Sequence, residues 1–439
     1  MAVSANGGKS RFLTTDFRVA QIVRKRMRTT RKEVAAAAYL GDVSDPIKRL
    51  IAAGIVSSHN PNRAAGTALA RASGRPTHWL TLSRELGFLI GIDIAHGKVS
   101  VTVTRADFER VFEEAPLTRS VPRLDEEPAA ALDAAADLVR EAVAAAADSD
   151  GLTADRVIGI GVGLPAPVNR ATKTIGAEMH ILSSWSNLKP VDELRNRFAD
   201  LLPDVEIEVD NDASLGALGV HSYETLSFDP TNPEASPPPR DLIYVRVTDG
   251  IGAGVVIKGK LVGGGSGVAG EIGHVKVDDR GRFCHRCGQR GCVETKSSER
   301  AVIEEVAQTV FDKRREEVSI EEVVDRDHPA CRRAMQEAGM HLGLALAHAR
   351  TLLDPTCIYL GGALTESQRY FMPGVKTGLI SNSIDSGRAQ SMIRIAPPGL
   401  RRNRPDLDSP ELLGAIAKVL HRCGDEYIKR RMVIAEASS

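Results

Sequence analysis

Three cysteines and a histidine are grouped in a way that could bind a metal ion. Three of the six cysteines fall within nine residues, in the segment Cys284-His-Arg-Cys287-Gly-Gln-Arg-Gly-Cys292, and a histidine lies ten positions before the first. Three thiolates and one imidazole are the ligands of a closed, tetrahedral zinc site. Two glycines inside the segment let the backbone turn tightly enough to bring the thiolates together. The sequence predicts a structural zinc ion with the ligands His274, Cys284, Cys287 and Cys292.

A redox-active dithiol is the alternative for Cys284 and Cys287. Such a pair is expected at the strand-to-helix turn of a βαβ unit, and it needs neither a third cysteine nor a histidine. The remaining cysteines, Cys331, Cys357 and Cys423, are scattered among apolar residues and are expected to be buried free thiols. This cysteine usage indicates a reducing, cytoplasmic environment.

Length and composition set the frame for the whole chain. With 439 residues, of which 42% are hydrophobic, the chain is long enough for about three domains with real cores. No stretch reaches the roughly 20 apolar residues needed to span a bilayer. Residues 1–12 lack the apolar segment of a secretory signal. We therefore expect a cytoplasmic protein without a membrane partner.

The net charge of zero conceals two oppositely charged parts. Residues 1–85 hold 15 Lys and Arg against 5 Asp and Glu, whereas the remainder holds 42 against 52. A basic module on an acidic body is typical of a nucleic-acid-binding arm attached to a sensing or catalytic body. Charge alone is equally compatible with a basic face that only meets solvent, so the pattern within the module decides.

Apolar spacing predicts three helices in the basic module. A stripe of apolar residues at helical intervals predicts the first, over 15–28. The segment Thr30-Arg-Lys-Glu33 has the form of a capping box, which predicts a second helix that runs to Leu40. Ser44 is expected to cap a third helix over 45–53.

Two short strands, expected at 55–57 and 77–82, complete the module. Three helices followed by a hairpin are the order of a winged helix-turn-helix, which we assign to residues 1–85. In this motif the third helix enters the major groove, while the second helix and the wing reach the DNA backbone. The candidate DNA contacts are Arg31, Lys32, Lys48, Arg49 and Arg75.

Beyond Gly87, apolar strands end in acidic residues. The run 89–94 carries Asp93 and leads through a turn into 99–103, and the run 243–257 forms a second hairpin around Asp249. A strand, an aspartate, a turn and a strand near the start of each half indicate two related α/β lobes around a cleft. The expected lobes are 86–212, on which a C-terminal helix at about 408–430 packs, and 213–407.

A long ordered combination of motifs resembles the ROK family of repressors, open reading frames and sugar kinases. It consists of Gly250-Ile-Gly-Ala-Gly, then Gly267-Val-Ala-Gly-Glu-Ile-Gly-His274, then the cysteine segment and Glu294. The resemblance covers essentially the full chain and includes the winged helix of the repressor branch. It implies an actin-like body of two ribonuclease-H-type lobes that close on a sugar.

The resemblance also implies which residues bind the sugar. The family uses the Asp of an Asn-Asp pair, the Glu and His of an ExGH motif and the Glu after the last cysteine. Carboxylates accept hydrogen bonds from sugar hydroxyls, and a pocket that pairs every hydroxyl rejects sugars that lack one. The matching residues here are Asp212, Glu271, His274 and Glu294.

His274 would serve both sites, because one ring nitrogen can bind zinc while the other meets a sugar hydroxyl. Zinc would then fix the orientation of the ring without taking part in a reaction. The alternatives are a helix cap for Asp212, and supporting or surface positions for Glu271 and Glu294.

A sugar kinase of this family would use Asp212 as a base, with glycine-rich turns at the ATP phosphates. The first hairpin reads Asp93-Ile-Ala-His-Gly97 where the kinases have Asp-x-Gly-Gly-Thr. The second reads Thr248-Asp249-Gly250 where they have Gly-Thr-Gly, and a carboxylate there would repel phosphates. The turn Leu360-Gly-Gly-Ala363, which resembles the adenosine-side loop, is retained. His180 stands where an Asn is expected before Trp185, which puts the identity of the sugar in question.

We therefore expect a repressor that binds a double-stranded DNA operator, senses a sugar or sugar phosphate, and has lost phosphate transfer. A homodimer or a dimer of dimers is expected, since operators mirror the two-fold symmetry of the protein. Sugar binding must then change the two DNA-binding heads through different affinities for two conformations. The alternative is a glucokinase-like enzyme that uses ATP and Mg²⁺ with Asp212 as catalytic base. A third possibility is a sensor that answers to a protein partner.

Overall fold

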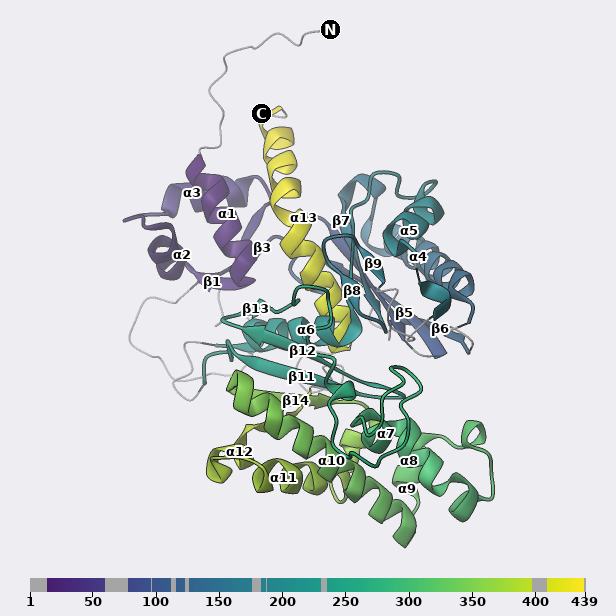
Figure 1. Ribbon diagram of the computed structural model, residues 1–439. Coiled ribbons are helices and arrows are strands. Elements are labelled where there is room, and N and C mark those ends of the chain that lie inside the picture. The colour runs from purple at the N-terminus through teal and green to yellow at the C-terminus, as the bar shows by residue number, and fades with distance from the viewer. Residues whose placement is uncertain are drawn as a thin grey trace.

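The computed structural model describes residues 14–59, 78–95, 97–111, 116–122, 126–175, 183–186, 188–229, 235–396 and 409–437. A small N-terminal head is followed by two α/β lobes (Figure 1). The C-terminal helix then returns between the head and the first lobe, so that it lies beside the first helix of the head. None of the helices in the described ranges is long and apolar enough to cross a membrane.

The head is a winged helix-turn-helix. Its three strands form one antiparallel sheet in the order β1-β3-β2. The elements are α1 (Thr14–Arg26), β1 (Arg28–Thr30), α2 (Arg31–Ala38), α3 (Ser44–Ala52), β2 (Val56–His59) and β3 (Trp79–Leu82). The sequence did not indicate β1, because its three residues directly precede α2 and include its cap.

One of the two expected helix caps is present. Thr30 Oγ1 accepts the N–H of Glu33 at 3.3 Å, and Glu33 Oε2 accepts the N–H of Thr30 at 2.8 Å, which confirms the capping box. The expected cap at Ser44 is wrong, since Ser44 is already the first residue of α3. Its N–H and hydroxyl donate to Asp42 Oδ1 at 2.9 and 2.7 Å, because the carboxylate two residues earlier is the stronger acceptor.

The first lobe is built on a five-stranded mixed sheet in the order β10-β7-β4-β5-β6. The strands are β4 (Phe88–Ala95), β5 (Gly97–Arg105), β6 (Leu117–Val121), β7 (Val157–Leu164) and β10 (Ile207–Asn211). Since β4 and β7 are buried on both faces, they are continuous apolar runs. The helices α4 (Pro128–Asp150) and α5 (Pro190–Phe198) share a core with one face, and β8 (Val168–Asn169) and β9 (Thr174–Ile175) form a small hairpin beside it.

The second lobe repeats this plan with the strand order β13-β12-β11-β14-β15. The strands are β11 (Leu242–Val247), β12 (Ile251–Ile257), β13 (Lys260–Leu261), β14 (Cys357–Gly361) and β15 (Ile393–Ile395). One face carries α8 (Glu299–Val306), α9 (Ile320–Asp325), α10 (Pro329–Leu353), α11 (Phe371–Ser381) and α12 (Ser386–Met392). The other face packs against α6 (Asp212–Ser227), which begins directly after β10 and so connects the lobes.

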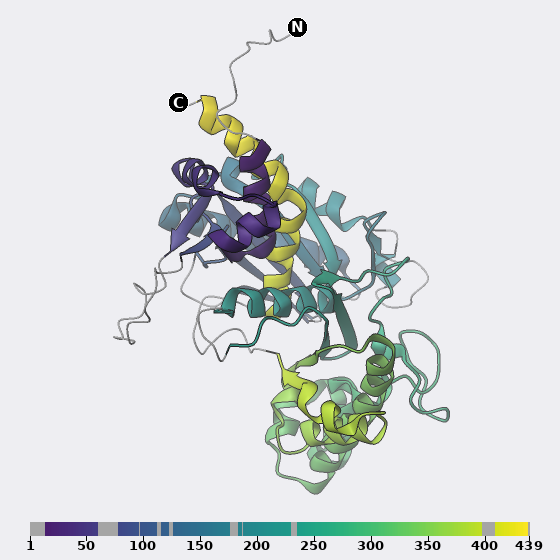
Figure 2. The same cartoon turned by 90° about the vertical axis from the view of Figure 1, so that its left-hand side faces the viewer.

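The helix α13 (Pro410–Ala437) ties the three parts together. With 28 residues it is about 42 Å long. It packs against β4 and β7 of the first lobe, against α6 and against α1 of the head (Figures 1 and 2). The sequence anticipated its packing on the first lobe; it did not anticipate that α13 also contacts the head.

The head shares a core with the body. Val19 and Val23 of α1 and Leu50 of α3 belong to one buried cluster with Leu89 of β4 and Leu420 of α13. Hydrogen bonds also connect α1 to α13, since the Arg24 side chain donates to Asp425 Oδ1 at 2.7 Å and to the carbonyl of Leu420 at 3.0 Å. Movement of α13 is therefore expected to move the head.

Two glycines allow α6 and α13 to cross with their backbones in contact. A Cβ on Gly414 would lie 1.8 Å from the carbonyl oxygen of Leu215, and one on Gly219 would lie 1.8 Å from that of Pro410. Both distances are far below van der Waals contact, so any larger residue must push the helices apart.

Gly414→Ala is therefore expected to lower the free energy of unfolding by about 1–3 kcal/mol, the usual range for overpacking. The control is Gly387→Ala in α12, where the nearest atom, Asp385 Oδ1, lies 3.7 Å away. Urea denaturation of both variants measures the difference. Equal midpoints for the two would contradict the close crossing.

Candidate functional site

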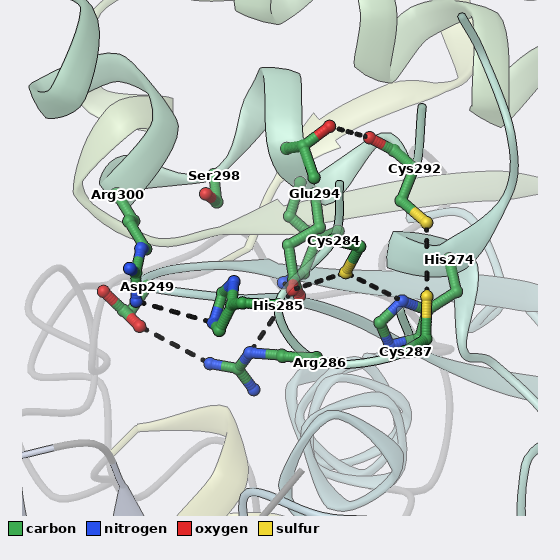
Figure 3. Close-up of polar contacts among 12 residues, drawn as sticks. Asp249, His274, Cys284, His285, Arg286, Cys287, Cys292, Glu294, Ser298 and Arg300 are labelled. Atoms are coloured by element: carbon green, nitrogen blue, oxygen red, sulfur yellow. Dashed lines mark hydrogen bonds and ion pairs between the residues drawn. The ribbon is translucent and has the colours of Figure 1, made fainter. Parts of the chain in front are cut away.

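The four predicted metal ligands converge on one point. Their ligand atoms all lie within 4.8 Å of one another. Cys284 Sγ is 3.7 Å from His274 Nδ1, and the Sγ atoms of Cys287 and Cys292 are 3.5 Å apart (Figure 3). Zinc–sulfur bonds of about 2.3 Å at the tetrahedral angle place neighbouring sulfurs about 3.8 Å apart. The cluster could therefore hold one tetrahedral metal ion.

The backbone of the cysteine segment is shaped by glycine. Gly288 and Gly291 have φ of +71° and +73°, in the left-handed region that side chains disfavour. A Cβ on Gly291 would also lie 1.6 Å from the carbonyl oxygen of Asp278. The N–H of Gly288 donates to the carbonyl of Cys284 at 2.8 Å and closes the first turn. These positions aim the three sulfurs at His274, which ends a short 3-10 helix at Ile272–His274.

Ionisation is disfavoured at one thiol of the cluster, that of Cys292. Burial first, and then the neighbouring Cys287 and Cys284, raise the pKa of the Cys292 thiol well above its ordinary value. Because thiolates are the ligands in metal sites, a divalent cation would supply the charge that stabilises them.

The cluster adjoins a small polar pocket between the lobes. The pocket is lined by the loop 165–167 and by Asn211, Asp212, Arg246, Thr248, Glu271, His274, Arg286 and Glu294. The four residues that the family resemblance implied for sugar binding are thus side by side. His274 links the two features, since Nδ1 points to Cys284 while Nε2 lies 3.9 Å from Glu271 Oε2.

Asp212 is held by neighbours and does not cap its helix. The N-cap of α6 is Asn211, whose side chain accepts the N–H of Ser214 at 3.0 Å. Arg246 Nη1 donates to Asp212 Oδ2 at 2.8 Å, and the N–H of Ala213 donates to Oδ1 at 2.6 Å. A hydroxyl that approached Asp212 would have to share it with Arg246.

Glu294 lines the pocket but is largely engaged by the protein. It is only 4% exposed. Its Oε2 accepts the N–H of Ile251 at 3.0 Å, and its Oε1 lies 3.3 Å from Arg286 Nε (Figure 3). Glu294 therefore supports the turn between β11 and β12 as well as the pocket wall.

Glu271 is the pocket carboxyl whose ionisation is most perturbed. Burial, followed by the charges of Asp212 and Glu294, raises the pKa of Glu271 to about 7. A carboxyl with this pKa can donate a hydrogen bond to a ligand hydroxyl when protonated and accept one when ionised.

Sequence reasoning missed the two arginines of the pocket. Arg286 comes from the cysteine segment and lies between Glu294 and Asp249, whose Oδ2 is 3.4 Å from its Nη2. Arg246 comes from the end of β11 and is buried among acidic side chains. A charged residue in an otherwise apolar strand was the available signal for Arg246, and the location inside the cysteine segment was the signal for Arg286.

The turns where a kinase would hold nucleotide phosphates carry acidic side chains. Asp249 pairs with Arg315 at 3.5 Å as well as with Arg286. Glu299 Oε1 accepts the N–H of Ala363 in the retained Gly361-Gly362-Ala363 turn at 3.1 Å. Burial raises the pKa of Glu299 to about 7. An ionised carboxylate disfavours a bound polyanion, and Glu299 ionises as the pH rises through about 7.

The head presents some of its predicted DNA contacts to solvent. Arg31 and Lys32 are exposed at the start of α2. Lys48 is exposed on α3 and pairs with Asp45 at 3.2 Å. Arg49 instead forms a two-point ion pair with buried Asp16 of α1, both contacts at 2.8 Å. Arg75 in the head and His180 in the first lobe lie outside the described residues.

Comparison with known proteins identifies relatives of the body. A family model described as ROK family matches residues 89–407. The xylose repressor of Caldicellulosiruptor bescii is 26% identical over 300 residues, which are 66% of this chain and 69% of that protein. The DNA-binding transcriptional dual regulator NagC of Escherichia coli is 26% identical over 272 residues, 60% of each protein.

Solved structures confirm the predicted fold class. A ROK family transcriptional regulator described as a homologue of the E. coli MLC protein superposes with a TM-score of 0.65 at 19% identity, over 95% of this chain and 99% of that one. A ROK family glucokinase from Streptomyces griseus, in complex with glucose and AMPPNP, has a TM-score of 0.58 at 21% identity, over 75% and 98%. The first match includes the head, and both include the two-lobed, sugar-kinase-type body.

The burial of Glu299 predicts that the stability of the folded protein depends on pH. Its folded-state pKa of about 7 lies above the ordinary value of 4.5, so the folded state binds the extra proton. Its contribution to stability is therefore present at low pH and is lost as the pH rises through 7. Relative to wild type, Glu299→Gln should stabilise the protein by about 1 kcal/mol at pH 8 and have little effect at pH 5, as measured by urea denaturation. Equal effects at both pH values would contradict the assignment.

Proposed function

The chain belongs to the ROK family, and from this membership we propose that it is a DNA-binding transcriptional repressor whose kinase-like body senses a sugar. The observation that carries the proposal is that one chain joins a winged helix to a sugar-kinase-type pocket. The winged helix shares a core with α13, and the pocket is lined in part by Asp212 of α6, on which α13 packs. Relatives named xylose repressor and N-acetylglucosamine repressor support it.

We propose that the sugar binds among Asp212, Glu271, His274 and Glu294. Asp212 and Glu271 offer carboxyl oxygens to hydroxyls, and His274 Nε2 faces the same space. The arginine side chains of the pocket add donors that a kinase pocket would not need, since guanidinium groups can hydrogen-bond ring and hydroxyl oxygens. The effector class that fits is a monosaccharide or its derivative.

The kinase alternative fits the geometry less well. A general base must be free to take the proton of the attacking hydroxyl. Asp212 is instead paired with Arg246, whose positive charge stabilises the ionised carboxylate and weakens it as a base. Asp249 and Glu299 stand at the turns where ATP phosphates would lie.

For DNA we propose that α3 enters the major groove. Lys48 then faces DNA directly, and Arg31 and Lys32 reach the backbone from α2. Arg49, through its pair with Asp16, fixes α3 on α1 instead of reading bases. Arg75 stays a sequence-based candidate, because it lies outside the described residues. We also propose a homodimer, with each protomer divided into the head at 1–85 and the lobes at 86–212 and 213–407.

We propose that the ion in the His274, Cys284, Cys287 and Cys292 cluster is zinc. Three sulfurs and one nitrogen in a tetrahedral arrangement suit this metal. Bound there, zinc would fix the cysteine segment and the ring of His274, and would thus shape one wall of the pocket.

The proposal is tested with DNA duplexes that the protein itself selects from a random pool. One sugar among xylose, glucose, N-acetylglucosamine and their phosphates should change the affinity for the selected duplex by about 5- to 150-fold, as measured by fluorescence anisotropy. Asp212→Asn should keep DNA binding and lose the response. Sugar-dependent ADP release with ATP and Mg²⁺ would instead favour the kinase. If no sugar changes the affinity for DNA, the result would instead favour a sensor that responds to a protein partner.

Metal analysis tests the zinc assignment. Purified protein should carry about one zinc per chain, and Cys287→Ser should lose it, unfold at a lower temperature and bind the effector about tenfold more weakly, because His274 loses its anchor. The matched control is Cys331→Ser, which changes a buried cysteine outside the cluster. Full zinc content in Cys287→Ser would rule out this ligand set.

A further inference from the structure

We propose that Arg246 positions Asp212 for the ligand and passes the state of the pocket to the DNA-binding head through Glu411 and α13. The inference rests on the proposed function, because it describes how an occupied pocket alters DNA binding. It concerns Arg246 of the strand β11, which lines the pocket, and Glu411 of the helix α13, which is not among the residues proposed to bind the sugar.

Arg246 is a single cation shared by three carboxylates. Its Nη1 lies 2.8 Å from Asp212 Oδ2, its Nη2 lies 3.5 Å from Asp93 Oδ2, and its Nε lies 3.7 Å from Glu411 Oε1. The Arg246 side chain is 12% exposed, and those of Asp93 and Glu411 are 6% exposed each. Because these side chains are largely shielded from water, the electrostatic attraction between Arg246 and the carboxylates is expected to be strong.

The three carboxylates belong to different parts of the molecule. Asp93 lies near the end of β4 of the first lobe, Asp212 is the first residue of α6, and Glu411 lies in the first turn of α13. Arg246 itself belongs to β11 of the second lobe. Any relative movement of the lobes therefore changes the distances between the guanidinium and the three carboxylates.

Ligand binding would change this division directly. A sugar hydroxyl that donates to Asp212 competes with Arg246 Nη1 for the same carboxylate. When its contact with Asp212 weakens, the Arg246 guanidinium can pair more strongly with Glu411, whose Oε1 lies 3.7 Å from Arg246 Nε. Glu411 is fixed in turn by the hydroxyl of Tyr244, which donates to it at 2.6 Å.

The helix α13 carries the change to the head. Asp425 lies fourteen residues after Glu411 on the same helix, about 21 Å along its axis. It accepts hydrogen bonds from Arg24 at 2.7 Å and from Gln21 at 2.8 Å, both on α1. Figures 1 and 2 show α13 as one continuous helix, which packs against α6 and against α1. A shift or rotation at Glu411 therefore reaches α1 through a rigid element.

The test uses Glu411→Gln, which keeps the size of the side chain and an acceptor for Tyr244. Sugar affinity by calorimetry should stay within about threefold, while the sugar-induced change in operator affinity should fall below about twofold. Asp425→Asn, at the far end of the path, should give the same result. Arg246→Lys keeps the charge but loses the planar fork, so it should weaken sugar binding about tenfold.

Arg105→Lys is the matched control, because Arg105 is also buried and paired, with Asp150, but does not bridge the lobes. It should leave both sugar binding and coupling unchanged. If wild type responds to sugar and Glu411→Gln responds equally, the path through α13 is wrong while the proposed function stands. If Arg246→Lys binds sugar as wild type does, Arg246 does not position Asp212.

A second measurement does not need an effector. Hydrogen exchange of the unliganded protein should be faster in α1 and around Asp425 in Glu411→Gln than in wild type, and unchanged there in Arg105→Lys. Should wild type respond to no sugar, the proposed function fails, and this comparison alone decides the inference. If hydrogen exchange in Glu411→Gln changes only in residues near Glu411 and not in α1 or around Asp425, the proposed path through α13 is wrong.

Discussion

The structure depends on one buried charge, the guanidinium of Arg246, at the point where both lobes and the C-terminal helix meet. Three carboxylates from three elements surround it, so none of them can be buried comfortably without it. Breaking such a group by removing one partner typically costs about 3–5 kcal/mol. Burial and the neighbouring acids already raise the pKa of Asp93 to about 6, although Arg246 opposes this. The same charge therefore holds the lobes together and occupies the acid that a kinase would use as its base.

The metal cluster constrains the opposite wall of the pocket. His274 and Glu294 flank the cysteine segment in the sequence and also border the pocket, and Arg286 projects from between two of the cysteines. Ordering this segment therefore orders three pocket side chains at once. A loop with two left-handed glycines and few apolar residues has little else to fix it. A metal ion bound here would have a structural role, and its effect would fall on ligand recognition.

Patterns that repeat along the chain were predictable from the sequence, whereas contacts between distant elements were not. The helices of the head, the buried strands β4 and β7 and the convergence of His274 with the three cysteines all followed from local spacing. The strand β1 was too short to detect, and Asp42 displaced Ser44 as the acceptor before α3. The pairing of Arg49 with Asp16 was not predicted, because the two residues lie 33 positions apart. Arg246 was missed for the same reason, since its partners lie 34, 153 and 165 positions away in the chain.

These contacts suggest how a kinase fold can act as a sensor. Phosphate transfer requires a free base and an electropositive nucleotide site, and in this chain both are occupied by the protein's own ion pairs. Sensing requires that a ligand bind two conformations with different affinity, and that the difference reach another site. An arginine that shares its charge among carboxylates of three elements would provide the first condition, because a ligand on Asp212 changes the balance. A helix that packs on the lobe and on α1 provides the second. In the proposed path, the arginine that occupies Asp212 is also the one that contacts Glu411 of α13 and so connects the pocket to the head.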